Sequence, residues 1–371
     1  MVKKVKILIL LAIMLLCSSC RLGYLIKAGK GQFNLISNSI PVEEALKSGH
    51  LTEEQKSKLR LVAEIKAFGE EVLGLSKTRN YKTAYVREHS PIYLISASPK
   101  DRLALKTWWF PLVGEMPYLG FFDLGEALRE KARLFKEDLD VVVSKAEAYS
   151  TLGWFRDPVT LNLIDGSNLE LVEIILHEMT HTTMYIEGQG EFNEGLASLV
   201  GKFGALLFME QKYGSPHFFT VEARHSICDE RLFSCFLSSL LTKIEKLYNS
   251  PLDYSEKLIM RKKIFESSLE QLDRIKIKFY TGRYERFGRY GLNNAYLLTV
   301  GLYHRNFNLF ESILEKNGGS IKDMLSFLKG LEREGGDMLS KMAATFSEPL
   351  EPCKTIVKTP NIELCAENTI P

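Results

Sequence analysis

The stretch SNLELVEIILHEMTHTTMYIEGQGEFNEGLAS, residues 167–198, decides how the rest of this chain is interpreted. It opens with Ser167 and Glu170, which have the spacing of a capping box and predict the start of a helix. Apolar residues then recur at three- and four-residue steps, the period of a helix with one buried face. Gly188 is placed to end this helix, because glycine is favoured just after a helix C-terminus.

Two histidines and a glutamate lie inside the predicted helix, in the run His177-Glu178-Met179-Thr180-His181. Histidines at positions i and i+4 project from one face one turn apart, so their imidazoles can bind one tetrahedral metal ion. Glu178 is rotated by about 100° from His177, so it can face a metal-bound water without binding the metal. We therefore expect His177 and His181 to be zinc ligands and Glu178 to be the general base of a hydrolase. A structural helix whose histidines happen to lie four apart is the alternative.

A catalytic zinc site needs a third protein ligand, and Glu194 is the candidate. It lies 13 residues after His181, in the run FNEGLAS, which predicts the start of a second helix folded back by a short glycine-containing turn. Gly195 is small, so the two helices can approach closely. Asn193 and Ser198 are expected to support the ligands through hydrogen bonds. An ordinary acid at a helix start, which the helix dipole favours, is the alternative for Glu194.

HExxH followed by Asn-Glu-x-x-Ala resembles the gluzincin clan of zinc peptidases, and the run NEGLA is similar to the second motif of M1-type aminopeptidases. More widely, the chain resembles a family of bacterial envelope lipoproteins described as "putative aminopeptidases". That resemblance begins at Cys20, covers nearly the whole mature chain and includes the segments Gly29 to Leu35, Pro117 to Phe122, Ala148 to Phe155 and Asn293 to Ala295. It implies a zincin-like fold, one zinc ion held by His177, His181 and Glu194, and peptides as substrates.

The same resemblance indicates residues that contact the substrate. In gluzincins an edge strand just before the zinc helix pairs with the peptide backbone, and the segment containing Gly153 and Trp154 has that position; a core strand is the alternative. Tyr303 is the candidate donor of a hydrogen bond to the oxyanion, with core packing as the alternative. The M1 motif Gly-x-Met-x-Asn has only a partial counterpart in Gly114-Glu115-Met116, where Glu115 is expected to be an exposed acid in a turn.

The first 19 residues predict a lipoprotein signal peptide. Lys3, Lys4 and Lys6 precede the apolar run Ile7 to Leu16, which is shorter than the roughly 20 residues that span a bilayer. Two serines and Cys20 then resemble a lipobox, which would make Cys20 the lipidated first residue; ordinary cleavage that leaves a plain thiol is the alternative. We expect a lipid-anchored protein of the cell envelope, at the outer membrane facing the periplasm if the cell has two membranes.

Four further cysteines would enter an oxidising compartment, and Cys228, Cys235, Cys353 and Cys365 allow three pairings. The pairing of Cys353 with Cys365 is favoured because it would fix the tail. Cys228 and Cys235 would lie roughly 10 Å apart on one helix, too far for a bridge. The chain contains no CxxC pair, so we do not expect these cysteines to bind zinc.

The rest of the chain divides into a strand-rich part and a helical part. Short apolar segments bounded by prolines fill residues 80–160, and almost all of residues 167–345 have a helical pattern. Thr52 and Gln55 form a further capping box, which predicts a helix that packs on the main core. We expect one α+β domain over residues 20–345, with a small mixed sheet N-terminal to the helical half, the active site at their junction and a tail at 346–371.

Charge argues against a nucleic-acid partner. The chain of 371 residues has a formal charge of +2, and beyond residue 20 it carries 45 basic and 46 acidic side chains. Basic and aromatic residues alternate over residues 276–290, which we interpret as a solvated face over a core stripe; a lipid-facing or nucleic-acid surface is the alternative.

Together these patterns predict zinc-dependent hydrolysis of peptide bonds in the cell envelope, by an aminopeptidase. An endopeptidase on the same zinc core is one alternative. A zinc-stabilised lipoprotein that binds peptides without hydrolysing them is another, but an intact Glu178 favours hydrolysis because a scaffold has no need of the base. The patterns leave the oligomeric state open.

Overall fold

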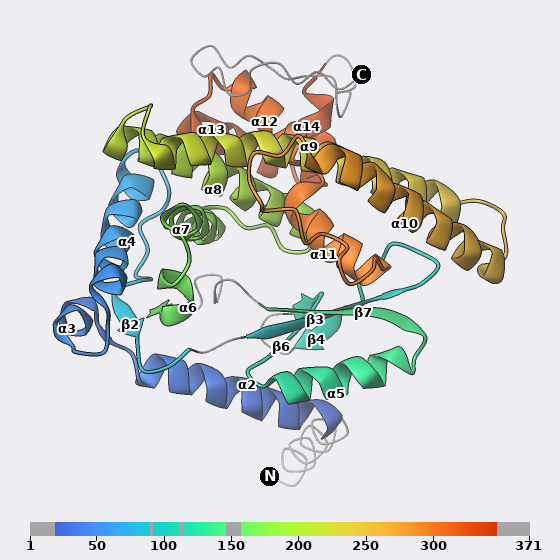
Figure 1. Ribbon diagram of the computed structural model, residues 1–371, viewed down its shortest axis with the longest axis horizontal. Helices are drawn as coiled ribbons and strands as arrows, with labels where there is room; N and C mark the ends of the chain where they lie inside the picture. Colours follow the sequence, from blue (N-terminus) through green and yellow to red (C-terminus); the bar gives the residue numbers. More distant parts are fainter. Residues whose placement is uncertain (1–18, 90–91, 111–113, 146–156, 347–371) are drawn as a thin grey trace, which may run out of the picture.

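The computed structural model describes residues 19–89, 92–110, 114–145 and 157–346, and Figure 1 shows how its helices and strands are arranged. The described helices are α2 (Ser19–Ser37), α3 (Val42–Lys47), α4 (Glu53–Glu71), α5 (Leu124–Phe135), α6 (Leu161–Ile164), α7 (Asn168–Thr183), α8 (Gly190–Tyr213), α9 (Phe218–Tyr248), α10 (Tyr254–Lys276), α11 (Asn294–His304), α12 (Phe307–Lys316), α13 (Ile321–Glu332) and α14 (Met338–Ala344). The described strands are β1 (Ile40–Pro41), β2 (Thr83–Tyr85), β3 (Tyr93–Pro99), β4 (Trp108–Phe110), β5 (Gly114–Met116), β6 (Leu119–Phe121), β7 (Leu139–Lys145) and β8 (Val159–Thr160).

The described strands form three small sheets rather than the single mixed sheet that we expected. β2 pairs antiparallel with β1 and parallel with β8, so this sheet has mixed sense. β3 lies between β6 and β7 and is antiparallel to both, and β4 and β5 form a two-stranded sheet. The strands are short; Pro99 is the last residue of β3 and Pro117 lies between β5 and β6, because proline has no N–H to donate to a ladder. The strand predicted for Ala148 to Phe155 lies outside the described residues.

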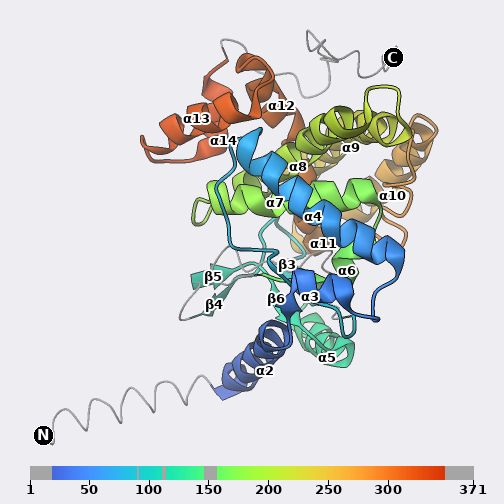
Figure 2. The same cartoon turned by 90° about the vertical axis from the view of Figure 1, so that its left-hand side faces the viewer.

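The helical pattern predicted for residues 167–345 is confirmed, and α7 lies in the middle of the largest core. α4 and α8 pack against α7, and Figure 2 shows α4 passing across it. The capping box predicted at Thr52 and Gln55 is present at the start of α4. Near the other end of α4, Phe68 packs edge-to-face on Phe208 of α8, with 5.3 Å between the ring centroids. Packing on these sides fixes the direction in which the polar residues of α7 project.

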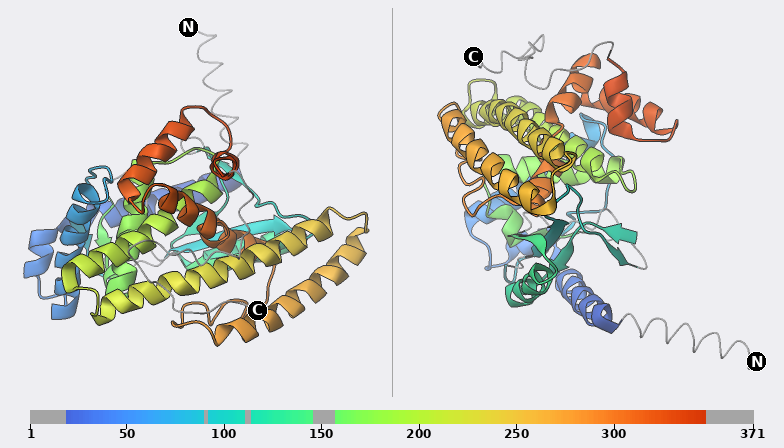
Figure 3. Two further views of the ribbon diagram at one scale, coloured as in Figure 1. Left: turned by 90° about the horizontal axis from the view of Figure 1, so that it is seen from above. Right: turned by 90° about the vertical axis from the view of Figure 1, so that its right-hand side faces the viewer.

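Two further cores complete the molecule. The long helices α9 and α10 lie side by side (Figure 3), and with the segment after α10 they enclose a core that includes Phe233, Phe265 and Tyr284. The third core lies between α5 and the sheet of β3. The fold is therefore of the α+β class, with helices predominating. Among the described helices, none is both long and apolar enough to span a bilayer.

Two of the four cysteines lie in the described residues. Cys228 and Cys235 are both on α9, the one-helix arrangement for which we expected no bridge between them. Cys228 is disulfide-bonded, and Cys235 is not its partner. Cys353 and Cys365 themselves lie outside the described residues, as do residues 1–18. Cys20 lies in the first turn of α2.

A buried ion pair joins α9 to α12, and a third ionisable group lies beside it. Arg231 donates from its Nε to Glu311 Oε1 at 3.0 Å, and both side chains are about nine-tenths buried. Glu315 lies one turn further along α12, and its Oε1 has no hydrogen-bond partner among the described residues. Burial and the nearby charge of Glu311 raise the pKa of Glu315 to about 7, although Arg231 acts in the opposite direction.

Glu315→Gln is expected to stabilise the protein at pH 8 but not at pH 5. The folded pKa lies above the ordinary value of about 4.3, so the native state binds more protons than the unfolded chain, and wild-type stability falls as the pH rises from there to about 7. Because the side chain is partly exposed, the expected gain at pH 8 is about 1 kcal/mol rather than the full equivalent of the shift. Urea unfolding at the two pH values measures it, with the exposed Glu332→Gln as control. An equal gain at both values would contradict the assignment.

Candidate metal centre

α7 begins where the sequence predicts and ends earlier than expected. The Ser167 hydroxyl accepts a hydrogen bond from the Glu170 N–H at 3.1 Å, and Glu170 Oε2 accepts one from the Ser167 N–H at 2.8 Å. The helix ends at Thr183 because Met184 adopts extended backbone and buries its side chain in the core. Gly188 instead makes the turn into α8, with a φ of 78° that glycine adopts without strain.

Asn193 holds the loop between α7 and α8. Its Oδ1 accepts a hydrogen bond from the Ile186 N–H at 2.9 Å, and its Nδ2 donates to the Ile186 carbonyl at 2.7 Å. Both polar atoms of the side chain are thus engaged by the loop backbone, so Asn193 supports the ligands through the loop rather than by a direct hydrogen bond. Its effect on the site is indirect, because it fixes the chain immediately before Glu194.

His177 and His181 of α7 converge with Glu194 of α8. His177 Nε2 lies 3.1 Å from both His181 Nε2 and Glu194 Oε2, and His181 Nε2 lies 3.4 Å from Glu194 Oε2. Ligand atoms about 2.0–2.1 Å from a tetrahedral zinc ion lie about 3.3 Å from one another, which is close to these separations. Within the described ranges, this is the group of three side chains that could hold a metal ion.

The electrostatics of the group favour an ionised glutamate. Burial alone would raise the pKa of Glu194, but hydrogen bonds to His177 and His181 hold it far below its ordinary value. Burial likewise acts to lower the pKa of His181, and the hydrogen bond and charge of Glu194 outweigh it and raise that pKa. A cation at this place is therefore stabilised by the carboxylate, whether it is a proton on the imidazoles or a metal ion.

Glu178 carries a carboxylate oxygen that the described protein leaves unused. Its Oε2 is buried and has no hydrogen-bond partner among the described residues. Its charge contributes to raising the pKa of the buried Tyr81, whose main cause is burial, and the pKa of His181. An unpaired buried carboxylate oxygen costs free energy unless something binds it, so Glu178 is poised for a proton or a polar substrate group.

Three tyrosines surround the metal-ligand group. The ring of Tyr303 stacks on that of His177 with 5.9 Å between centroids and 24° between planes, and Tyr185 meets the His181 ring edge-on at 6.2 Å. Burial, then the charge of Glu194, raises the pKa of Tyr118. The sequence reasoning found Tyr303 but missed Tyr118 and Tyr185. Tyr185 lies beyond the end of α7 at Thr183, so helical spacing could not have identified it.

A buried ionic network supports α7 one turn before His177. Arg283 Nη1 lies 2.6 Å from Glu173 Oε2, and Ser226 donates to Glu173 Oε1 at 3.1 Å. Lys202 of α8 lies 3.8 Å from the same carboxylate. Arg283 belongs to the basic and aromatic segment that we interpreted as a solvated face. Arg283 is exposed and the neighbouring Tyr284 and Phe287 are buried, in agreement with that interpretation, and the segment folds back so that this guanidinium also reaches a buried acid of α7.

The close approach of α7 and α8 depends on a glycine other than Gly195. A Cβ on Gly195 would meet Phe310 of α12 at 2.4 Å, so its small size serves a different contact. A Cβ on Gly201 would lie 2.7 Å from the Glu173 carbonyl oxygen and 3.5 Å from the His177 Cβ. Gly201 therefore marks a close contact between the backbones of α7 and α8 beside the ligand His177.

Gly201→Ala is expected to destabilise the protein by about 1–3 kcal/mol and to weaken metal binding. The added methyl group would push α8 away from α7 and so separate Glu194 from the two histidines. Gly330→Ala on α13 is the matched control, because a Cβ there meets nothing within 4 Å and should stabilise the helix by about 0.5–1 kcal/mol. Thermal unfolding and metal titration of both variants test this; a Gly201→Ala protein as stable as wild type would contradict it.

The remaining predicted residues have different outcomes. Ser198 is buried on α8, and within the described structure it makes no hydrogen bond to His177 or His181. Gly153 and Trp154 lie outside the described residues. Gly114 to Met116 form β5, so Glu115 is exposed as expected but lies in a strand rather than in a turn. A Cβ on Gly114 would lie 3.6 Å from Oε1 of Glu187, an acid of the α7–α8 loop, so β5 lies beside that loop.

Comparison with known protein families shows which family the chain belongs to. A family model described as "Putative aminopeptidase" matches residues 23–337. The chain belongs to this family. The match includes α7, α8 and α11, and thus the candidate metal ligands, Glu178 and Tyr303. A search of curated proteins found no match, and neither did a search of solved structures.

Proposed function

We propose that the protein is a zinc-dependent aminopeptidase of zincin-like fold that acts on peptides in the cell envelope. The observation that carries this proposal is the convergence of His177, His181 and Glu194 next to the unpaired carboxylate oxygen of Glu178. Membership of the aminopeptidase family supports the peptide substrate. The small sheets beside an enclosed zinc helix are compatible with a zincin-like fold.

The donor set fits one zinc ion. Two imidazole nitrogens and one carboxylate oxygen form the ligand set of many catalytic zinc sites, and three protein ligands leave a coordination position for water or substrate. When bound, zinc supplies a Lewis acid that polarises a carbonyl group and lowers the pKa of water. His177, His181 and Glu194 would hold the ion, and the ionised carboxylate of Glu194 is opposite in sign to the metal's charge.

The chain's own side chains move the protons. Glu178 accepts the proton of the attacking water at its unpaired Oε2 and delivers it to the nitrogen of the leaving amine. Tyr303, which lies against His177, donates its hydroxyl hydrogen to the carbonyl oxygen as negative charge develops there. Burial raises the pKa of the neighbouring Tyr118, which keeps that phenol protonated as a further donor.

The proposed location rests on the N-terminal sequence. Residues 1–19 are the proposed signal peptide, and lipidation of Cys20 would tether α2, which has Cys20 in its first turn, close to the membrane surface. The charge balance beyond residue 20 gives no support to a nucleic-acid partner.

Peptide cleavage followed by mass spectrometry tests the activity. Zinc-loaded protein is offered one peptide mixture with free N-termini and the same mixture with acetylated N-termini. Loss of single N-terminal residues from free peptides alone is the expected result. Internal cuts in both mixtures would make the protein an endopeptidase. If zinc is bound and neither mixture is cleaved, the hydrolytic proposal fails and a zinc-stabilised peptide-binding protein takes its place.

A further inference from the structure

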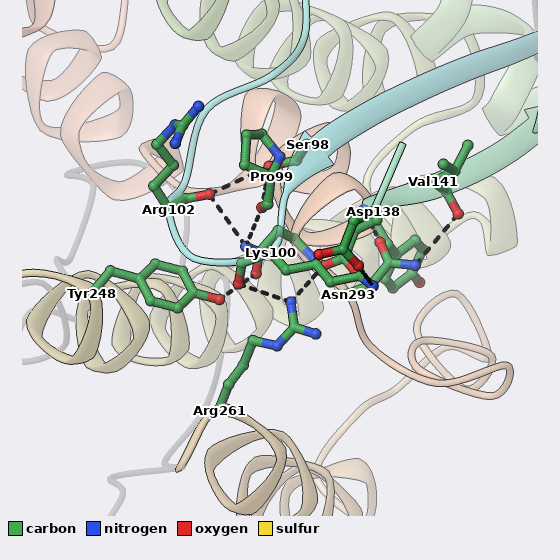
Figure 4. Close-up of polar contacts among 12 residues, drawn as sticks. Ser98, Pro99, Lys100, Arg102, Asp138, Val141, Tyr248, Arg261 and Asn293 are labelled. Carbon is green, nitrogen blue, oxygen red and sulfur yellow. Dashed lines mark hydrogen bonds and ion pairs between the residues drawn. The ribbon is translucent and has the colours of Figure 1, made fainter. Parts of the chain in front are cut away.

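The run Asn293-Asn294-Ala295 has no part in the chemistry described above, yet it lies where the helical half meets the sheet. It forms the start of α11, the helix that carries Tyr303 near its other end. α11 packs on α8 and α9 and also on β3 and β7, so it contacts both the helical half and the sheet. Figure 4 shows the polar contacts at this start, where Tyr248 and Arg261 approach from the helical half and Pro99 and Arg102 from the sheet.

Asn294 is the centre of these contacts and is completely buried. Its Nδ2 donates to the carbonyl oxygens of Pro99 at 2.8 Å and Arg102 at 3.2 Å, so it holds the end of β3. Its Oδ1 accepts a hydrogen bond from the Tyr248 hydroxyl at 2.8 Å, which joins α9 to the same side chain. The amide of Asn294 therefore joins the end of β3 to α9, two elements far apart in the chain.

Asp140, at the start of β7, completes the joint. Its Oδ2 accepts a hydrogen bond from the Asn294 N–H at 2.9 Å and one from Arg261 Nη1 at 2.6 Å. Arg261 of α10 also donates to the Lys100 carbonyl at 3.1 Å. An acidic group at a helix N-terminus is favoured by the helix dipole, and here it is also paired with a buried guanidinium. We call Pro99, Arg102, Asp140, Tyr248, Arg261 and Asn294 the Asn294 joint.

The other end of α11 is held by a separate contact. His304 Nδ1 lies 2.6 Å from Oε1 of the completely buried Glu230 of α9. Burial acts to raise the pKa of Glu230, but His304 and Lys202 lower it to about 2. α11 is thus fixed at both ends, and Tyr303 precedes the residue that makes the second contact. A helix of 11 residues spans about 16 Å, so a displacement at the joint reaches Tyr303 through a rigid element.

We propose that Asn294 is a positioning residue that sets Tyr303 against His177 and thereby acts on turnover, an inference that rests on the function proposed above. The joint attaches α11 to the sheet, while α7 belongs to the helical core, so the joint determines how the two halves meet at the metal-ligand group. A displacement of about 1 Å at a reacting group can lower a rate by about 100-fold, which makes such attachment points functional.

A double-mutant cycle tests the route of the effect. Asn294→Ala is expected to lower kcat by about 10- to 100-fold with KM and zinc content unchanged. In a Tyr303→Phe background, the same substitution should lower kcat no further, because the group through which it acts is already absent. A decrease of equal size in both backgrounds would overturn the proposal. Asn317→Ala is the matched control, since Asn317 caps the C-terminus of α12 and bonds the Ile313 carbonyl of that helix.

A second measurement does not depend on activity. With a single fluorotyrosine at position 303 of the full mature chain, the ¹⁹F signal reports how the ring lies on His177, with or without zinc. Asn294→Ala should shift or broaden this signal, and Asn317→Ala should not. A signal unchanged in folded Asn294→Ala protein would refute the positioning role. If the chain proves to lack peptidase activity, the proposed function fails, while this measurement still tests whether Asn294 positions the ring of Tyr303.

A milder variant covers the case in which Asn294→Ala does not fold. Tyr248→Phe removes one hydroxyl from the joint and keeps the ring, so the chain should fold. We expect the same pattern at reduced size: a shifted ¹⁹F signal, a lower kcat and no further decrease in the Tyr303→Phe background. An unchanged signal in this folded variant would count against the proposal.

Discussion

Glu178→Gln should lower the rate of peptide hydrolysis by about 10²–10⁴-fold and leave zinc binding intact. The carboxamide has nearly the same shape as the carboxylate, but it cannot accept the proton of the attacking water. Glu178 is not one of the three converging ligands, so the metal-ligand group keeps its donors. Steady-state kinetics and metal analysis of the purified variant give the two readouts.

Glu178→Gln also tests how the carboxylate affects stability, because the unpaired Oε2 of Glu178 is buried. Exchanging an unpaired charge for a neutral amide should not reduce stability, and thermal unfolding should show a midpoint at or above that of wild type. Glu332→Gln on α13 is the control for a change at an exposed site. A Glu178→Gln enzyme with the wild-type rate would remove this residue from the mechanism.

Glu194→Gln, unlike Glu178→Gln, should lose the bound metal. The substitution makes the same chemical change only 16 residues away, but it removes the negative charge that pairs with both histidines. We expect zinc affinity to fall by more than about 100-fold, and activity to fall with it at limiting zinc. Competition titration with a chelating dye measures the affinity.

The two glutamate variants together separate a ligand from a base. Zinc raises the unfolding temperature of any variant that binds it, because a ligand that binds only the native state stabilises that state. Wild type and Glu178→Gln should therefore show a zinc-dependent increase that Glu194→Gln does not. If Glu194→Gln still binds one tight zinc ion, Glu194 is not a ligand and the site must be assigned again.

Local regularities in the chain were sufficient for the first helix of the site. The capping box at Ser167 and Glu170 places the start of α7, and the helical period places His177 and His181 on one face. Both rest on interactions within about four residues, which sequence spacing reveals directly. The resemblance to a peptidase family added Tyr303, whose ring lies on His177.

Residue spacing could not predict contacts between segments that are distant in the chain. Asn193 matches a family motif, but the motif does not reveal that its amide holds the Ile186 backbone. Arg283 lies in a segment with the pattern of a solvated surface, yet it pairs with the buried Glu173. Neither outcome can be inferred from composition or period, because each depends on which segment folds back onto which.

By itself, the sequence determined which residues can bind a metal ion and which can act as a base, since helical geometry brings His177, Glu178 and His181 together wherever α7 lies. Only the tertiary structure decided that Glu194 reaches the same point, because this depends on the α7–α8 loop and on the bare backbone of Gly201 at the helix crossing. It also decided that Tyr303 faces His177, because α11 is attached to the sheet at Asn294 and to α9 at His304. Residue spacing predicts the geometry within one helix, whereas the packing of the whole chain determines which separate elements come into contact.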